Sequence, residues 1–237
     1  MTEEAPPPAV SSDWLNIFKS LQLGLVQGSY IRTINFHNTP LVKKDLYERQ
    51  LAFCQPYFSS VSQADMDSFF STGTWHKDKP GLIPVFYEGY RNNYDVAAPL
   101  AEKYGFVGWF FVPSAFPSVP VAEQRTFAEA HHIGTVKEYE DGRIAMTWDE
   151  LRELDQKHVI ACHTMHHERL TPDSPDTLLR QEIIESKQEL EHHLGHEVSA
   201  FAWLYGSEYG VNAKADSYVR EAGYRYLFSN FKIQKLR

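Results

Sequence analysis

Two histidines four residues apart give the strongest chemical signal in the sequence. His163 and His167 frame the segment His-Thr-Met-His-His, which directly follows an apolar run ending at Cys162. On a helical turn this spacing puts both imidazoles on one face, close enough to share a metal ion. A structural interpretation competes with metal binding, because the chain has 11 histidines, several in adjacent pairs, and the spacing also arises by chance.

A metal held by two histidines needs a further ligand, and a carboxylate would complete a two-histidine, one-carboxylate set. Glu88 closely follows the apolar run 81–86, but taken by itself it is better explained as an ordinary surface glutamate. Another apolar run, 201–204, leads into Tyr205 and Gly206, where the glycine would let backbone N–H groups face a ligand. The simpler interpretation of that segment is a turn.

These residues follow apolar runs that we predict to be strands, and the runs alternate with helical segments. Strands are predicted over residues 30–36, 81–86, 107–112, 158–162, 199–204 and 224–228. Helices are predicted over residues 41–72, 93–104, 174–194 and 213–222 and from residue 148 onward. This alternation predicts parallel β/α units, whose functional groups lie at the carboxyl ends of the strands. Pro84 argues against a central strand at 81–86, because proline cannot donate to the ladder.

The predicted fold class is α/β, a single-domain distorted or incomplete (β/α) barrel of about seven parallel strands. A full eightfold barrel takes roughly 250 residues, and this chain has 237. We expect a flexible tail over residues 1–13 and one domain over residues 14–237, which begins with a helical face between Asp13 and Val26. No internal repeat and no linker divides the sequence after residue 13.

The composition argues against several classes of protein. The chain carries 23 basic and 31 acidic side chains, a net charge of −8, which argues against a nucleic-acid partner. Two cysteines are too few for a disulfide scaffold. No run approaches the roughly 18 apolar residues of a membrane span, and the acidic, proline-rich start does not resemble a secretory signal. We therefore expect a cytoplasmic protein.

Three segments form a specific pattern when they are taken together. Residues 85–89 are Val-Phe-Tyr-Glu-Gly, residues 163–167 are His-Thr-Met-His-His, and residues 201–206 are Phe-Ala-Trp-Leu-Tyr-Gly. They resemble the motifs Thr-Phe-Asp-Asp-Gly, His-(Ser/Thr)-x-x-His and Phe-Ala-Tyr-Pro-Tyr-Gly of the polysaccharide deacetylase family, the NodB-homology domain of carbohydrate esterase family 4. The resemblance extends in order over about residues 80–229, which is far more specific than any one motif.

The resemblance implies a distorted (β/α) barrel with a divalent metal, most often zinc, that hydrolyses an N- or O-acetyl group on a saccharide or glycoconjugate. His163 and His167 match the family's metal-binding histidines, and Glu88 stands at the position of its metal-binding aspartate. Tyr205 stands where a backbone N–H of the family helps to hold the oxyanion. The metal would activate a water molecule and the N–H would stabilise the developing charge.

Three other residues are predicted to bind the substrate. His37 resembles a Tyr-His element that lies ahead of the domain in many members of the family. Trp203 is one of several aromatic residues that could stack on a sugar ring, although most aromatic residues of such a chain belong to the core. Glu208 follows the third motif closely.

Three departures from the family pattern bear on activity. Tyr87, our candidate catalytic residue, occupies the position of the catalytic-base aspartate, and a free tyrosine with a pKa near 10 is a donor rather than a base at neutral pH. Glu88 is one methylene longer than aspartate, which moves its carboxylate by about 1.5 Å. The late Leu-x-His motif, which supplies a catalytic acid, is missing, since no histidine follows His196.

Two functions therefore compete. In the first, which we favour because both histidines and a carboxylate are retained, the protein is a metal-dependent deacetylase. His37, His166 or Glu208 could then replace the lost groups, unless their roles are structural. In the second, it is a catalytically degenerate relative that binds a carbohydrate or partner without turnover, because loss of a general base costs typically 10²–10⁴-fold in rate. The sequence leaves the substrate, the metal and the oligomeric state open.

Overall fold

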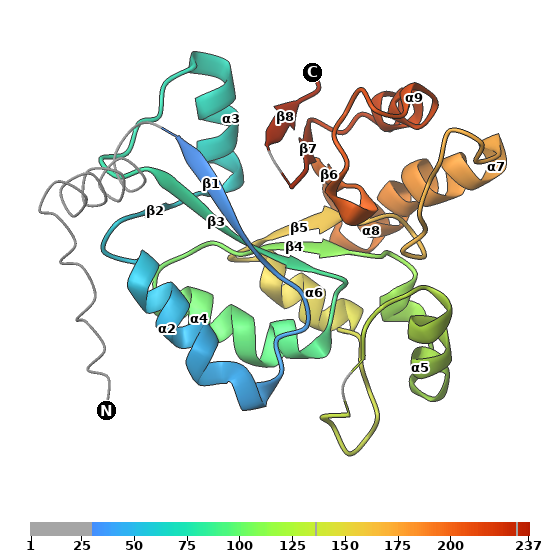
Figure 1. Ribbon diagram of the computed structural model, residues 1–237, viewed down its shortest axis with the longest axis horizontal. Coiled ribbons are helices and arrows are strands. Elements are labelled where there is room, and N and C mark those ends of the chain that lie inside the picture. The colour runs from blue at the N-terminus through green and yellow to red at the C-terminus, as the bar shows by residue number, and fades with distance from the viewer. Residues whose placement is uncertain (1–29, 136, 231) are drawn as a thin grey trace, which may run out of the picture.

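The computed structural model describes residues 30–135, 137–230 and 232–237, which form an α/β fold around one eight-stranded sheet (Figure 1). The strands are β1 (Ile31–Phe36), β2 (Ser59–Ser60), β3 (Gly81–Tyr87), β4 (Trp109–Val112), β5 (Val159–Cys162), β6 (Ala200–Ala202), β7 (Tyr226–Phe228) and β8 (Ile233–Lys235). Their order is β1-β3-β4-β5-β6-β7-β8, with β2 also paired to β3. The pairs that join β1 to β7 are parallel and β8 is antiparallel to β7, so the predicted fold class is confirmed.

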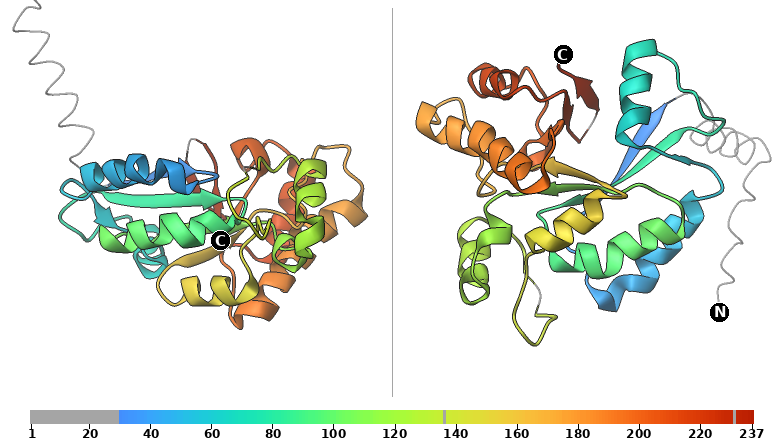
Figure 2. Two further views of the ribbon diagram at one scale, coloured as in Figure 1. Left: turned by 90° about the horizontal axis from the view of Figure 1, so that it is seen from below. Right: turned by 180° about the vertical axis from the view of Figure 1, so that it is seen from behind.

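Helices surround the outer face of the curled sheet in the views of Figures 1 and 2. They are α2 (Lys44–Cys54), α3 (Gln63–Thr72), α4 (Ala98–Lys103), α5 (Val121–Ala130), α6 (Trp148–Asp155), α7 (Asp176–Leu179), α8 (Ser186–Leu194) and α9 (Ala213–Ala222). Short π-helical segments, Asn93–Ala97 and Arg180–Glu185, lead into α4 and α8. None of the helices in the described part of the chain has the length and apolar character needed to span a bilayer. The tail and helix expected over residues 1–26 lie outside the described residues.

The sequence prediction differs from the structure at two elements. The segment 41–72, expected to be helical, contains the two-residue strand β2 between α2 and α3. Pro84 lies inside β3 and is aligned with Ile34 of β1. On the other side of β3, strand β2 is aligned with Gly81 and Leu82, and strand β4 is aligned with residues 85–87. Pro84 lies between these two stretches of pairing, so the N–H that proline lacks is not needed there.

Side chains alternate between the two faces of the sheet. The concave face carries one buried cluster to which β3, β4 and β7 contribute. Trp109 and Phe111 of β4 contact Phe228 of β7, with ring centroids 5.1 and 5.0 Å apart, although two strands separate β4 from β7 in the sheet. Such contacts require a strongly curled sheet. On the convex face, Phe110 and Phe201 belong to a second cluster that includes residues of α4, α6, α8 and α9.

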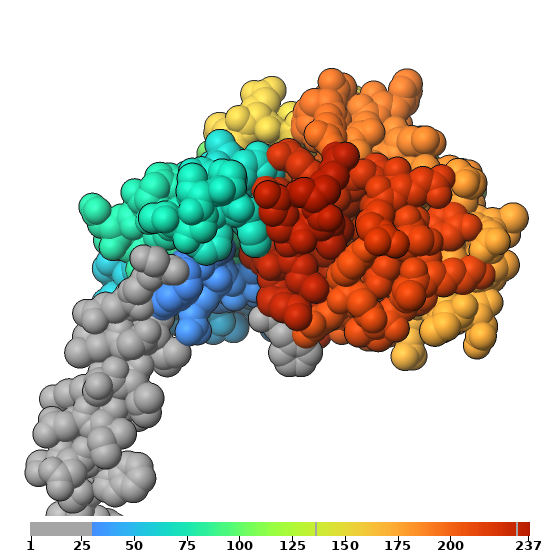
Figure 3. Space-filling model, turned by 90° about the horizontal axis from the view of Figure 1, so that it is seen from above, coloured from blue at the N-terminus to red at the C-terminus, as the bar shows by residue number. Residues whose placement is uncertain are grey.

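The barrel is incomplete, because β1 and β8 are the two ends of the sheet and do not pair. Helix α3 lies over this opening and packs against the C-terminal strands, as Figures 1 and 3 show. Asp67 of α3 accepts hydrogen bonds from Arg225 and from Tyr226 of β7, at 2.7 and 2.5 Å. Phe70 of α3 also contacts the Tyr226 ring, with centroids 5.3 Å apart.

Candidate metal centre

The carboxyl ends of the parallel strands bring together residues that are far apart in the sequence. His37 follows β1, Glu88 follows β3, His163 follows β5 and Trp203 follows β6. Because these strands are parallel, their carboxyl ends meet at one rim of the sheet. A cavity of about 300 Å³ opens there. It is lined by Asn35, His37, Tyr87, Glu88, His132, His163, His167, Trp203, Leu204, Tyr205, Gly206 and Asn230.

Glu88, His163 and His167 form a cluster with the composition of a metal site. One ligand atom from each residue lies within 4.8 Å of those of the other two. Glu88 Oε1 is 3.7 Å from His167 Nε2, and the side chains of Glu88 and His167 are only 8% and 10% exposed. One carboxylate and two imidazoles are suitable ligands for zinc and for other divalent transition metals.

Each histidine is oriented by a hydrogen bond from its other ring nitrogen. His163 Nδ1 donates to the carbonyl oxygen of Ala202 at 2.9 Å, and His167 Nδ1 donates to that of His131 at 2.7 Å. These bonds select the tautomer in which Nε2 carries a free lone pair, as metal-binding histidines require. Burial lowers the pKa of His163 to about 4, so its imidazole is neutral at pH 7. The residues present therefore fit a divalent cation.

Glu88 is ionised and is held by a third histidine. Burial by itself would raise the pKa of Glu88, but the contacts with His167 and His37 outweigh it and hold the pKa at about 2. His37 Nδ1 lies 2.7 and 2.9 Å from the two carboxylate oxygens. This hydrogen bond raises the pKa of His37, against the opposing effect of burial. His37 thus acts as a partner of the carboxylate, and its side chain remains 63% exposed at the mouth of the cavity.

The loop after β5 differs from the helical turn that the spacing of His163 and His167 suggested. Residues 163–167 are not helical, and Thr164 and His167 have left-handed backbone angles, with φ of 68° and 63°. Non-glycine residues rarely adopt this conformation, which costs energy unless the surroundings enforce it. The proximity of the two histidines was therefore predicted correctly, but a strained loop brings them together.

Glu182 holds this loop and was not foreseen from the sequence. The residue is fully buried, and its Oε2 accepts hydrogen bonds from the backbone N–H groups of Met165 and His166 at 3.0 and 2.9 Å. Its Oε1 lies 2.6 Å from His166 Nδ1. Although burial opposes ionisation, these hydrogen bonds lower the pKa of Glu182. His166, considered above as a replacement for a lost catalytic group, is committed to this contact.

Tyr87 lies beside the cluster as a protonated phenol. Its ring centroid is 5.1 Å from that of His163 and 5.2 Å from that of His37. Burial, followed by the charge of Glu88, raises the pKa of Tyr87 well above its ordinary value. The phenol is therefore a hydrogen-bond donor and cannot replace an aspartate as a base at neutral pH.

The segment after β6 bends sharply at Tyr205 and Gly206. Both have left-handed angles, with φ of 61° and 63°, and the Tyr205 side chain is 67% exposed. Asn230 Nδ2 donates to the Tyr205 carbonyl oxygen at 3.0 Å, and the Asn230 N–H donates to that of Gly206 at 3.1 Å. A Cβ atom at Gly206 would lie 2.2 Å from Asn230 Cγ, so only glycine fits. The backbone conformation and the close contact with Asn230 therefore both require glycine at position 206.

The cavity gathers most of the predicted site residues, but Glu208 lies outside it. Glu208 pairs with Lys232 at 2.5 Å and lines an adjoining cavity. Sequence reasoning missed Asn35, His132 and Asn230 as lining residues. Asn35 could have been found, because it lies two residues before His37 and therefore on the same face of the strand.

The family model described as polysaccharide deacetylase matches residues 76–227. A search of curated proteins finds no significant match.

Several solved structures have a similar fold. The deacetylase PplD of Streptococcus pyogenes, in complex with acetate, is similar with a TM-score of 0.63 and 15% identity, over 88% of this chain and 87% of that one. A de-N-acetylase from Aggregatibacter actinomycetemcomitans is similar with a TM-score of 0.61 and 19% identity, over 87% of this chain and 88% of that one. IcaB from Ammonifex degensii is similar with a TM-score of 0.58 and 16% identity, over 86% of this chain and 84% of that one. These likenesses concern the fold, whereas the family model matches more than half of the residues, and by that match the chain belongs to the polysaccharide deacetylase family.

Proposed function

We propose that the protein is a metal-dependent hydrolase that removes acetyl groups from an N- or O-acetylated saccharide or glycoconjugate. The observation that carries the proposal is the cluster of Glu88, His163 and His167 at the base of a cavity at the carboxyl ends of the strands. Membership of the polysaccharide deacetylase family supports the same reaction. Two proteins of similar fold are described as a deacetylase in complex with acetate and as a de-N-acetylase.

Glu88, His163 and His167 would hold the divalent ion, and we propose zinc because two imidazoles and a carboxylate suit it. When bound, the ion would polarise the acetyl carbonyl and lower the pKa of a water molecule. The Tyr205 N–H is assigned to stabilise the charge that develops on the carbonyl oxygen. His37 is assigned to proton transfer, because its Nδ1 is occupied by Glu88 and its Nε2 is left available.

A second candidate function is favoured by one specific observation. Tyr87 stands at the position of the family's catalytic base, and its raised pKa keeps it protonated. In this alternative the protein binds metal and saccharide without turnover.

Metal analysis combined with an acetate-release assay on acetylated chito-oligosaccharides separates the two functions. The hydrolase predicts one zinc ion per chain and release of acetate, with both lost in His167→Ala. His192→Ala serves as the matched control, because His192 is an exposed histidine on α8. Stoichiometric zinc without acetate release from several acetylated substrates would support the binding protein instead.

The double variant Tyr87→Asp, Glu88→Asp tests the divergent motif directly. If Tyr87 limits the rate, the variant should release acetate faster than wild type, because a positioned general base contributes typically 10²–10⁴-fold. If the variant binds zinc but is no faster, a group other than Tyr87 limits the rate, or the substrate class is wrong.

A further inference from the structure

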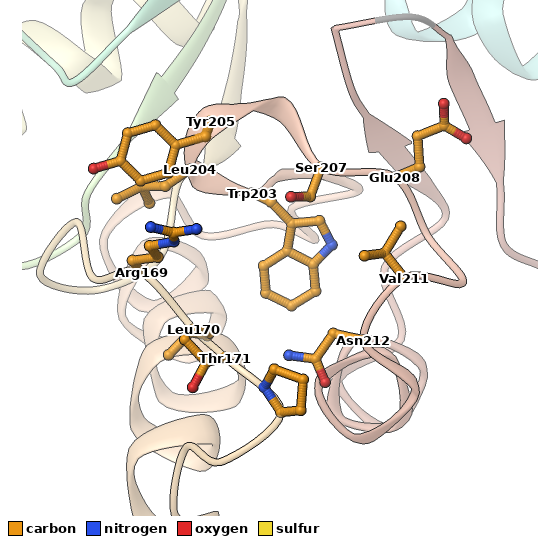
Figure 4. A pocket seen from close by; sticks show the side chains of 11 residues that line it. Arg169, Leu170, Thr171, Trp203, Leu204, Tyr205, Ser207, Glu208, Val211 and Asn212 are labelled. Carbon is orange, nitrogen blue, oxygen red and sulfur yellow. The ribbon is translucent and has the colours of Figure 1, made fainter.

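A second cavity adjoins the candidate metal centre (Figure 4). It has a volume of about 200 Å³ and shares Trp203, Leu204 and Tyr205 with the cavity of the metal centre. The rest of its lining comes from residues 169–172, which follow the histidine motif, and from residues of the segment 207–212 before α9. A ligand whose acetyl group reaches the metal centre therefore has room for another chemical group beyond Trp203.

Side-chain donors of Arg169, Ser207 and Asn212 in this second cavity have no acceptor within the described part of the chain. Asn212 Nδ2 is buried and has no partner, whereas Asn212 Oδ1 accepts from the Ala215 N–H at 3.1 Å. Within the described part of the chain, the Arg169 guanidinium and the Ser207 hydroxyl form no hydrogen bond or ion pair. In Figure 4, Ser207 and Asn212 lie on opposite sides of the Trp203 indole. Arg169 and Ser207 are exposed, so a ligand that enters the cavity from solvent can supply their acceptors, whereas Asn212 Nδ2 is a buried donor, and such donors in folded proteins normally have partners.

The second cavity also carries local positive charge. The Arg169 guanidinium lies over the Tyr205 ring, 5.2 Å from its centroid, and is not neutralised by a carboxylate of the described chain. Glu208, the acidic residue of the lining, is paired with Lys232 at 2.5 Å, and its carboxylate points away from Trp203 in Figure 4. A guanidinium binds planar or tetrahedral oxyanions through paired N–H groups. The lining therefore favours an anionic ligand in a protein whose net charge is −8.

We propose that the second cavity is a subsite for an anionic sugar, in which a carboxylate or phosphate group binds Arg169. Ser207 Oγ donates to an oxygen of the same ligand, Asn212 lines the wall of the cavity, and Trp203 packs against the sugar ring. That the bound sugar is also the substrate of acetyl removal rests on the proposed function, whereas the binding of an anionic sugar in this cavity does not. The substrate class is thereby narrowed from acetylated saccharides in general to acidic ones.

Sugars without an acetyl group test the subsite independently of catalysis. The full chain is titrated with D-glucuronate, D-glucose 6-phosphate and D-glucose, and binding is followed by saturation-transfer NMR and calorimetry. We expect at least one anionic sugar to bind about tenfold more tightly than glucose, because hydrogen bonds to charged groups exceed neutral ones. The better anionic ligand distinguishes a carboxylate from a phosphate substituent. Equal binding of all three sugars, or no anion binding up to about 10 mM, overturns the proposal.

Two variants and a matched control locate the bound anion. Arg169→Gln should weaken the anionic sugars about tenfold and leave glucose unchanged. Arg49→Gln makes the same charge change at an exposed arginine of α2 and should have no effect. Asn212→Asp keeps the oxygen that caps α9 but places a negative charge in the lining, so it should weaken binding of the anionic sugars and leave glucose binding little changed. Wild-type anion binding in both cavity variants means that the anion binds elsewhere, and the proposal is then wrong.

Failure of the subsite and failure of the hydrolase give different results. Tight binding of an anionic sugar, without acetate release from any acetylated substrate, retains the subsite and contradicts the hydrolase. In the opposite case, acetate is released equally efficiently from N-acetylglucosamine and N-acetylglucosamine 6-phosphate, and Arg169→Gln does not change the rate. That result supports the hydrolase and contradicts the subsite.

Discussion

At the scale of single residues, the candidate metal centre depends on a carboxylate that does not line its cavity. Glu182 binds the backbone of Met165 and His166 and also the His166 ring. The left-handed angles at Thr164 and His167 cost energy, so the loop keeps its shape only while such contacts hold it. Glu182 is therefore a positioning residue for His163 and His167, the candidate metal ligands.

Replacing Glu182 by glutamine should weaken zinc binding about 10- to 100-fold, the usual effect of losing a group that orients metal ligands. Glutamine lacks the charge and one of the two acceptor oxygens that hold the loop. Competition with a chromophoric zinc chelator measures the change. Glu189→Gln is the control, because that carboxylate on α8 is 40% exposed and pairs with His193. Unchanged zinc affinity in Glu182→Gln would show that other contacts hold the loop.

Zinc itself should stabilise the fold, because only the folded chain brings Glu88, His163 and His167 together. A ligand present at about 1,000 times its dissociation constant adds roughly 4 kcal/mol to the free energy of unfolding. Thermal unfolding with zinc and with a chelator gives the difference, which His163→Ala should abolish and His192→Ala should retain. A zinc-dependent shift that survives His163→Ala places the ion at another site.

Some of these residue roles could be predicted from the sequence and others could not. The motifs pointed to Glu88, His163 and His167, and the structure brings these three side chains together at the carboxyl ends of the strands. Glu182 has no such signal, since its role depends on how its helical segment packs under a loop that ends 15 residues earlier. Glu208 was assigned to substrate binding by position alone, and its pairing with Lys232 became visible only in three dimensions.

At the scale of elements, the turn after β6 is fixed by one glycine. Gly206 needs φ of 63° and lies against Asn230, which also holds the Tyr205 carbonyl. The turn therefore determines where the Tyr205 N–H points, and the stability of the fold and the geometry of the site depend on the same residue.

Gly206→Ala should lower the free energy of unfolding by about 2–4 kcal/mol, the sum of a left-handed alanine and a steric clash. Gly142→Ala is the matched control, because Gly142 has φ of 74° and no atom within 4 Å, so about 1 kcal/mol is expected there. Urea unfolding measures both values. Adding Asn230→Ala to Gly206→Ala should recover part of the loss, and equal losses at the two glycines would contradict the clash.

The helices could be predicted from the sequence where the apolar periodicity is long and capping residues mark the helix ends. The helix predicted from residue 148 onward is α6, which begins with a capping box formed by Thr147 and Glu150, and the helix predicted to end at residue 194 is α8, which Gly195 terminates with φ of 80°. Strand β2 was missed because two serines carry no strand signal and form a strand only through pairing with β3. Non-local pairing also explains why Pro84 is tolerated in β3.

At the scale of the whole molecule, a helix compensates for the missing closure of the barrel. The ends of the sheet, β1 and β8, do not pair, and α3 packs against the C-terminal strands through Asp67 and Phe70. The contact joins segments more than 150 residues apart, since the hydrogen bond from Tyr226 to Asp67 spans 159 residues. No local pattern in the sequence predicts it.

The stability of this closure should depend on pH. Burial by itself would raise the pKa of Asp67, but hydrogen bonds from Tyr226 and Arg225 outweigh it, and the pKa is lowered. A carboxyl whose pKa is lower in the folded state stabilises the fold above its unfolded pKa of about 3.9 and loses this effect as pH falls. Asp67→Asn keeps an acceptor oxygen but removes the charge.

Because the Asp67 side chain is 37% exposed, we expect Asp67→Asn to cost only about 1 kcal/mol at pH 7. The difference from wild type should shrink through about pH 4 and vanish at lower pH, where the native carboxyl is also protonated. Urea unfolding over a pH series measures it. Asp149→Asn is the control, since Asp149 is 92% exposed and its pair with Arg152 should contribute under about 0.5 kcal/mol. A difference that stays constant down to about pH 2 would mean that the asparagine disturbs packing, and that the charge does not hold α3 across the open barrel.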